Sequence, residues 1–168
     1  TDFIDLGRFN ESEYFYQMKP KILNQLAIAH VKNPYPHFFL QAHLDFENNI
    51  VYETISCSFL KNEILSLEFL LGVNNSKLFA WLLYKFVYNN AIRSTRYDEI
   101  YVSKIPCPDF LLVERKQIET LVSQILYLKK KDDNTDTSAL ENQIDQLVYT
   151  LYELKDEEIA IIQKQTTE

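Results

Sequence analysis

The sequence predicts an α+β fold, in which a small mixed or antiparallel sheet packs with helices and a C-terminal antiparallel helical hairpin follows. Two stretches, 38–46 and 50–59, are rich in β-branched and aromatic residues, which is typical of strands. After Pro108 the apolar residues recur at helical spacing, which is typical of helices that bury one face. We therefore expect a domain over residues 1–110 and a helical segment over residues 111–168.

The first predicted strands lie in the N-terminal third of the chain. Residues 14–32 contain a Lys-Pro-Lys step and an apolar run that suits either a short helix or a strand, and we favour the strand. Residues 33–37, Asn-Pro-Tyr-Pro-His, form a turn. The Glu-Asn-Asn step between 38–46 and 50–59 is a second turn signal, so these two stretches are expected to pair as a β-hairpin.

Two helices are expected next. Ser66 is a suitable N-cap for a helix over 66–73, and Gly72 is a suitable C-terminal stop. The following helix spans 75–88 and places a row of apolar side chains on its inner face. That row consists of Leu78, Phe79, Leu82, Leu83 and Phe86. A polar loop over 89–97, a strand over 99–103 and a proline-rich exit over 104–108 complete this part.

The C-terminal segment reads as paired helices. One helix carries Ile118, Leu121, Val122, Ile125 and Leu128 at helical spacing. After a polar connector, Ser138 and Glu141 match a capping box, and Asp156 is expected to cap a last short helix. Between these two caps, apolar residues step by four and three, which is coiled-coil spacing. These residues are Leu140, Ile144, Leu147, Leu151 and Leu154.

Composition excludes several classes of function. The chain has two glycines, so it cannot build the glycine-rich loop of a dinucleotide site or a P-loop. Cys57 and Cys107 stand far apart and lack the short Cys/His spacing of a zinc site, so we expect two small buried side chains in a reducing, cytoplasmic setting. No apolar run is long enough to span a membrane. The first residue, Thr1, suggests a piece of a longer protein.

The net charge of −7 opposes nucleic-acid binding at first sight, because phosphate contacts require Lys and Arg. The acidity is uneven, however. Residues 1–110 carry 10 Lys/Arg against 12 Asp/Glu, whereas residues 111–168 carry 7 against 12. The first part could therefore present a basic face.

Two motifs are similar to catalytic signatures, but a structural explanation suits each better. Asn33-Pro34-Tyr35-Pro36 is similar to the Asn-Pro-Pro-Tyr motif of amino-methyltransferases, but the second proline is displaced and a proline-rich turn accounts for it. Pro108-Asp109 with Glu114-Arg115-Lys116 is similar to a nuclease motif, but Asp109 fits better as a first-turn helix acid. We therefore predict no catalytic residue and no metal ligand here.

The basic residues offer a candidate DNA-binding set. The loop Arg93-Ser94-Thr95-Arg96 has two guanidinium forks, the shape best suited to a bidentate contact with guanine, and two hydroxyls. A solvated surface loop would have the same composition. The predicted contacts to phosphates and bases are Lys19, Lys21, His30, Lys32, Arg93, Ser94, Thr95, Arg96 and Lys104.

Three segments carry a resemblance to a known family. They are residues 19–59, which hold KPKIL and the predicted strand pair, residues 69–108, from FLLGVNNSKLFAWLLYKF to KIPCP, and IDQLVYTLYELKDEEIAII at 144–162. In this order they resemble the TaqI-like specificity domains, the C-terminal target-recognition domains of bacterial type II (type IIG-like) restriction-modification enzymes and adenine-specific DNA methyltransferases. Where that family often has Gly-Leu-Thr before its last helix, this chain has Glu153-Leu154-Lys155.

The resemblance implies a domain that reads double-stranded DNA and itself performs no catalysis. A methyltransferase or endonuclease region of the same polypeptide would be its second partner, and that region would hold S-adenosylmethionine and Mg²⁺. The helical segment 111–168 would act as a spacer or dock onto that region. Two alternatives remain: a protein-interaction module that works through the acidic helical hairpin, and a separate type I-like specificity subunit.

Overall fold

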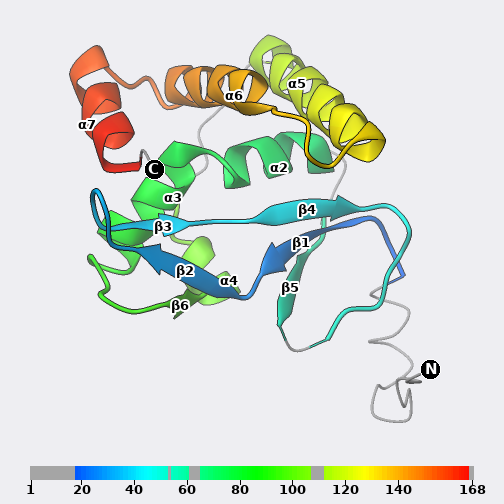
Figure 1. The fold of residues 1–168 in the computed structure, drawn as a ribbon, viewed down its shortest axis with the longest axis horizontal. Helices are drawn as coiled ribbons and strands as arrows, with labels where there is room; N and C mark the ends of the chain where they lie inside the picture. The colour runs from blue at the N-terminus through cyan, green and yellow to red at the C-terminus, as the bar shows by residue number, and fades with distance from the viewer. Residues whose placement is uncertain (1–17, 53, 61–64, 107–111, 167–168) are drawn as a thin grey trace.

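The computed structural model describes residues 18–52, 54–60, 65–106 and 112–166 and has the predicted α+β fold (Figure 1). Its described strands form two three-stranded antiparallel sheets, ordered β4-β1-β5 and β3-β2-β6. The strands span β1 Lys21–Gln25, β2 Ala27–Val31, β3 His37–Phe39, β4 Ala42–Asp45, β5 Ile55–Ser58 and β6 Thr95–Arg96.

The strand predicted in residues 14–32 is confirmed, but it is divided into β1 and β2 at Leu26. The backbone N–H of Leu26 donates to the carbonyl of Thr54 at 3.0 Å, and its carbonyl accepts from the N–H of Tyr97 at 2.7 Å. Leu26 therefore bonds toward both sheets, and β1 and β2 form their two central strands. One continuous segment of sequence thus joins the two sheets.

The hairpin predicted for 38–46 and 50–59 is wrong. Strands β4 and β5 do not pair with each other, because β1 lies between them, with Leu23 opposite both His43 and Cys57. The segment after β4 turns around the Asp45 carboxylate, which accepts hydrogen bonds from Glu47 and Asn49, and this turn leads the chain away from β4. The hairpin forms instead between β2 and β3, across the predicted turn at 33–37.

Helix α2, Leu67–Asn74, begins at the predicted N-cap, since the Ser66 hydroxyl accepts from the N–H of Phe69 at 3.1 Å. Gly72 does not end this helix. It lies buried inside α2, where a Cβ atom would be 2.6 Å from Cγ2 of Ile118. The glycine is required by close helix packing and not by a turn.

The next predicted helix is confirmed as α3, Lys77–Leu82, continuing into a π-helical turn, η2, Leu83–Val87. Leu78, Phe79 and Leu83 face the core as expected, but Phe86 is 71% exposed. The wider π-helical turn, in which the N–H of Tyr88 bonds to the carbonyl of Leu83, breaks the 3.6-residue spacing on which the prediction for Phe86 rested.

The strand predicted at 99–103 is wrong, because these residues form the short helix α4, Glu99–Val102. Asp98 caps it: its side chain accepts from the N–H of Ile100 at 3.3 Å, and its carbonyl accepts from the N–H of Val102. The β-branched residues that suggested a strand are overridden by this local cap. Cys107 and Asp109 lie outside the described residues, as does the predicted boundary near residue 110.

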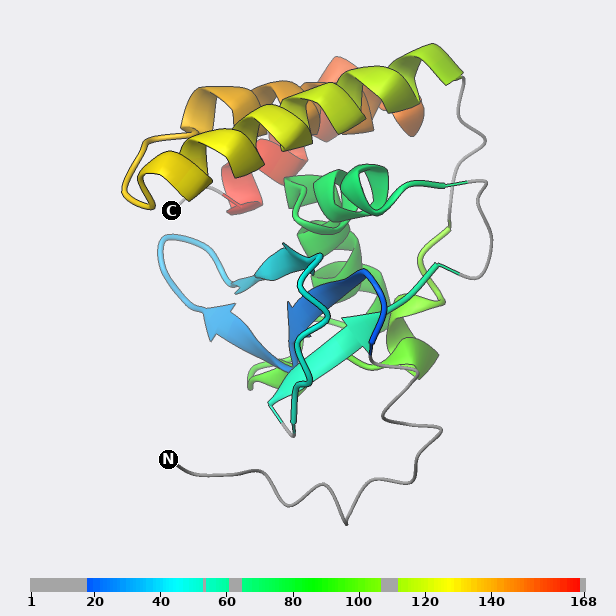
Figure 2. The same ribbon diagram turned by 90° about the vertical axis from the view of Figure 1, so that its right-hand side faces the viewer.

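The predicted C-terminal hairpin is formed by α5, Leu112–Lys131, and α6, Ser138–Leu151, and is followed by α7, Asp156–Thr166. Figures 1 and 2 show α5 and α6 lying across α2, on the side away from the sheets. Buried residues of all these elements form one hydrophobic cluster with β1 and β4. That cluster includes Ile22, Leu44, Phe69, Ile118, Val122, Ile144, Val148 and Ile162.

The helix ends differ from the predicted caps. The predicted capping box at Ser138 is wrong: the N-cap of α6 is Thr137, and its hydroxyl donates to the Glu141 carboxylate at 2.6 Å and accepts no hydrogen bond from the helix backbone. Before α7 the N–H of Lys155 donates to the Glu158 carboxylate, so Asp156 is not the cap. Glu153 has a φ of 53°, the left-handed conformation that a glycine adopts most easily, and α6 ends there despite the missing glycine.

Replacing Gly72 by Ala should lower the free energy of unfolding by about 1–3 kcal/mol, because the methyl group overpacks the α2–α5 contact. Alanine's higher helix propensity would act in the opposite direction and is smaller, about 1 kcal/mol. Urea denaturation measures the change, with Ser123→Ala on the exposed side of α5 as the control. A Gly72→Ala protein as stable as wild type would contradict the tight contact.

Candidate nucleic-acid interface

The two sheets leave one face open, because α3 and α4 lie behind β2 and β3 in Figure 1, as the turned view of Figure 2 also shows. Cross-strand partners point to the same side of a sheet. The pairs Gln25–Ile55, Leu23–His43, Ala29–Phe39 and Ala27–Arg96 therefore identify the side chains of this face. We call the following set the outer strand face: Gln25, Ala27, Phe39, Gln41, His43, Ile55 and Arg96.

All seven residues of the outer strand face line one open concave surface with a volume of about 1560 Å³. Its opposite wall comes from the helices and includes Asn75, Lys77 and Lys129. There the ammonium of Lys77 lies 3.0 Å from the Asp145 carboxylate, and burial raises the pKa of Asp145 although Lys77 opposes that shift. The groove is therefore bounded by a strand wall and a helix wall.

The strand wall differs in charge from the acidic chain as a whole. The described lining residues from β1 to β6 include Arg96 and His43 but no Asp or Glu. On the helix wall, Asp145 is paired with Lys77, and Glu141 accepts a hydrogen bond from Thr137. In a protein of net charge −7, the described part of the strand wall is thus a local region without Asp or Glu.

Arg96 is the predicted DNA contact that the structure places on this wall. Its backbone is paired with Ala27 on β2, and the Tyr88 hydroxyl donates to its carbonyl oxygen. Its side chain is exposed and, within the described residues, forms no ion pair or hydrogen bond. The strand thus fixes the backbone and leaves the guanidinium available to a ligand.

A buried hydrogen-bond chain holds the residue that follows Arg96. The hydroxyl of Tyr97 donates to Oδ1 of Asn74 at 2.7 Å, and Nδ2 of Asn74 donates to Oδ1 of Asn24 at 2.9 Å. Asn24 then donates to the Ser58 hydroxyl at 2.9 Å. Burial raises the pKa of Tyr97 to about 12, so the phenol stays protonated as a donor. This series of hydrogen bonds connects the residue after β6 to α2, β1 and β5.

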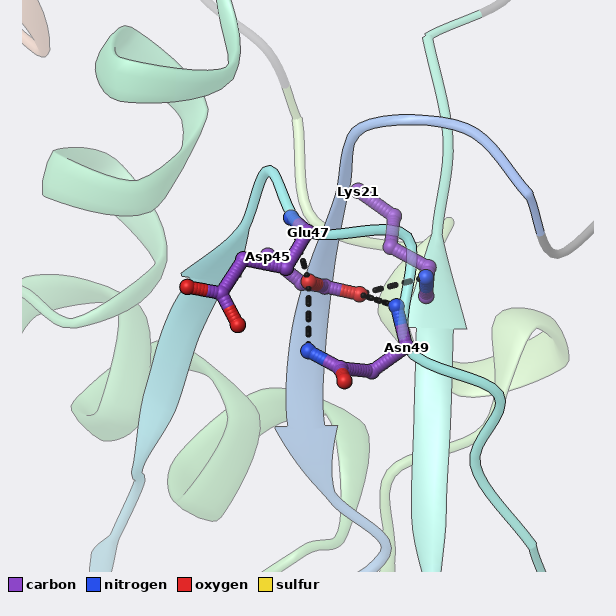
Figure 3. Close-up of polar contacts among 4 residues, drawn as sticks. All are labelled: Lys21, Asp45, Glu47 and Asn49. Carbon is purple, nitrogen blue, oxygen red and sulfur yellow. Dashed lines mark hydrogen bonds and ion pairs between the residues drawn. The ribbon is translucent and has the colours of Figure 1, made fainter.

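Lys21 is a correction to the predicted set. Its side chain has 0% exposure, and its ammonium lies 2.6 Å from the Asp45 carboxylate (Figure 3), so it is not available to a phosphate. Burial alone would raise the pKa of Asp45, but hydrogen bonds from Lys21, Glu47 and Asn49 outweigh it and hold this pKa below 3.8. The ion pair fixes the loop after β4 instead.

The remaining predicted contacts do not line the groove. His30 and Thr95 point inward: the His30 ring stacks on Tyr84 with centroids 5.8 Å apart, and the Thr95 hydroxyl is buried. Lys19, Lys32, Arg93, Ser94 and Lys104 are exposed. The ammonium of Lys104 lies 5.1 Å from the centre of the Tyr101 ring. These exposed residues surround the sheets and do not converge on one point of the groove.

Sequence reasoning missed the uncharged residues of this surface, namely Gln25, Gln41 and Phe39. The predicted strand could have indicated Gln25, because Lys21, Leu23 and Gln25 alternate along it with residues that face the helices. The wrong strand pairing prevented the assignment of the other residues, because a hairpin of 38–46 with 50–59 would not have placed His43 beside Leu23. Amide and aromatic side chains could only be assigned once the register was known.

The described residues contain no group of His, Cys, Asp and Glu that could hold a metal ion. Cys57 is half-buried, and burial raises the pKa of its thiol. Among the described helices, none is long and apolar enough to cross a membrane. No family model matches the chain. A search of curated proteins likewise gives no match.

Replacing Asn74 by Ala should lower the free energy of unfolding by about 2–4 kcal/mol, because the buried Tyr97 hydroxyl would lose its Asn74 acceptor and Oδ1 of Asn24 would lose its donor. Tyr97→Phe removes only the terminal donor and should have the smaller effect, about 1–2 kcal/mol. Chemical denaturation measures both, with the exposed amide variant Gln146→Ala as the control. Equal stability of Asn74→Ala and the control would show that the chain of hydrogen bonds contributes nothing.

Replacing Lys21 by Met should lower the free energy of unfolding by about 3–5 kcal/mol at pH 7, because the Asp45 carboxylate stays buried without its cation. In wild type the depressed pKa gives stability that is complete above the unfolded pKa and is lost as the pH falls through the folded pKa. Without Lys21 that folded pKa rises toward or above the unfolded value, so the stability lost on acidification should become smaller or change sign. Urea unfolding from pH 3 to 7 tests this, with exposed Lys116→Met as the control; identical pH profiles would refute it.

Proposed function

We propose that the chain is a DNA sequence-recognition domain of a restriction-modification enzyme. It would position a separate N6-adenine methyltransferase or endonuclease part on its target site. The observation that carries the proposal is Arg96, an exposed arginine on a paired strand within a wall whose described lining residues include no Asp or Glu. Such an arginine suits a bidentate contact with guanine in the major groove.

Rigid placement of Arg96 supports a role in reading bases. A bidentate contact discriminates between bases only when the guanidinium is held in register, and Tyr88, Tyr97 and Ala27 fix the backbone on both sides of it. The antiparallel strands also suit the major groove, which admits a two-stranded ribbon. Direct base contact is therefore the role we assign to Arg96.

The exposed cations outside the groove suit phosphate contacts. Lys32 follows β2, Arg93 precedes β6 and Lys104 follows α4. Phosphate contacts position a protein on DNA without reading sequence, so they do not need the fixed backbone of Arg96. They also provide local positive charge in a chain whose overall charge is negative.

Catalysis is assigned to the rest of the enzyme. In this proposal S-adenosylmethionine and Mg²⁺ bind in the methyltransferase or endonuclease region of the same polypeptide, to which α5–α7 dock, and the enzyme acts in the cytoplasm. Gly72 and Ile118 support a fixed attachment of the helices, since α5 packs on α2 without space for an added methyl group. A rigid helical layer would transmit the orientation of the recognition domain.

A protein-interaction module is the alternative function. The exposed Tyr127 and Ile161 on the acidic helices favour it, because such residues suit a protein partner. In that case DNA affinity would be absent or unspecific. Salt dependence separates the two functions, because DNA binding weakens steeply with rising salt.

Arg96→Ala should weaken binding to a preferred duplex by roughly tenfold or more and reduce its preference for guanine. Fluorescence anisotropy of the chain with labelled duplex DNA at several salt concentrations measures this. Arg93→Ala, a phosphate contact in this proposal, should weaken binding to all sequences alike and reduce the salt slope by about one.

Lys116→Ala is the matched control, since it removes one exposed positive charge from α5. Affinity and sequence preference unchanged by Arg96→Ala would remove this residue from the interface. A wild-type chain with no salt-dependent affinity for duplex DNA would favour the protein-interaction alternative.

A further inference from the structure

The amide side chains of the groove fall into two groups. On the helix wall, Asn75 donates to the carbonyl of Ala42 at 3.0 Å, and Asn142 accepts from the ammonium of Lys77 at 2.9 Å. These two amides are engaged within the protein. On the strand wall, the exposed amides of Gln25 and Gln41 make no hydrogen bond within the described residues.

The two open amides lie together because the backbone joins them. The N–H of Gln25 donates to the carbonyl of Gln41 at 3.0 Å, so β1 meets the segment between β3 and β4 at this point. Gln25 is also opposite Ile55 on β5. The backbone at both positions is therefore held by the sheet, while both amide groups remain available to a ligand.

Arg96 lies close to this pair along the same wall. Its strand partner, Ala27, is two residues after Gln25. The chain bends at Leu26 between them, and two residues of chain span at most about 7 Å. Successive base pairs are separated by about 3.4 Å, so side chains at Gln25 and Arg96 could reach bases about two steps apart. Ala27 lies beside Arg96, and Phe39, which is 39% exposed, lies on β3 across β2 from Arg96.

We propose that Gln25 and Gln41 are base-reading residues that, with Arg96, recognise a double-stranded site containing an adenine within about two base pairs of a guanine. This inference rests on the proposed DNA-recognition function and adds the chemistry of its target. Glutamine forms a bidentate contact with adenine at N6 and N7, as arginine does with guanine at O6 and N7. The described strand wall carries Arg96 and no Asp or Glu, which favours an anionic partner over a cationic one.

The experiment is selection from a randomised duplex pool by the wild-type chain, followed by affinity measurements for each base at each selected position. We expect a consensus with a guanine and a nearby adenine. Gln25→Ala or Gln41→Ala should reduce the adenine preference by roughly 5- to 100-fold and leave the guanine preference intact. Arg96→Ala should have the reverse effect.

A change of specificity provides a sharper readout than loss of binding. Glutamate accepts a hydrogen bond from N4 of cytosine. Gln25→Glu or Gln41→Glu should therefore change the preferred base from adenine toward cytosine. Gln143→Ala on the exposed side of α6 is the matched control and should preserve the wild-type consensus. Thermal unfolding of each variant should match wild type, because both glutamines are exposed.

The outcomes separate the two levels of the proposal. If the wild-type chain binds no duplex, the DNA-recognition function fails and the assignment of bases fails with it. If the chain selects a sequence but both glutamine variants keep the wild-type consensus, only the present inference is overturned. A single-stranded pool of the same sequences is the further arm, and selection from it in preference to the duplex would overturn the major-groove assignment.

Discussion

The hydrogen-bond chain from Tyr97 through Asn74 and Asn24 to Ser58 is the constraint on which the arrangement of this protein depends. It is buried, so each polar group in it would destabilise the fold if left without a partner. Its members come from positions far apart in the sequence, and they satisfy one another only when β1, β5, α2 and the residue after β6 are correctly assembled. These hydrogen bonds therefore select one arrangement of the strands and helices among the many that hydrophobic burial alone would allow.

The outer strand face follows from that arrangement. With Tyr97 held inward, Arg96 pairs with Ala27 and points outward, and β1 presents Gln25 on the same wall. The Lys21–Asp45 pair fixes the loop after β4 and neutralises the acid that β4 would otherwise bring to this side of the sheet. The described residues thus form a groove wall without Asp or Glu, on hydrogen-bonded strands, in a chain of negative net charge.

Most correct predictions rest on interactions between residues close in the sequence, and the strand order, which depends on residues far apart, was predicted wrongly. Short-range signals predicted α2 from Ser66 and the helical hairpin from its apolar spacing. They failed at 99–103, where the Asp98 cap overrides β-branched residues, and at Phe86, where a π-helical turn changes the spacing. The order of the strands could not be predicted, because the insertion of β1 between β4 and β5 depends on contacts between distant residues. For the same reason Arg96 was predicted as a candidate, whereas Gln25 and Gln41 were not.

The sequence by itself determined the fold class, most helices and the shortage of glycines and clustered cysteines that excludes several kinds of site. It also determined the inventory of basic residues, because composition and local periodicity are properties of the chain alone. The tertiary structure decided which of these residues face a common groove. Lys21 became buried with Asp45, His30 turned toward Tyr84, and Arg96 remained exposed. The physical reason is that strand register, which a shift of one residue would invert, assigns every side chain to one face or the other.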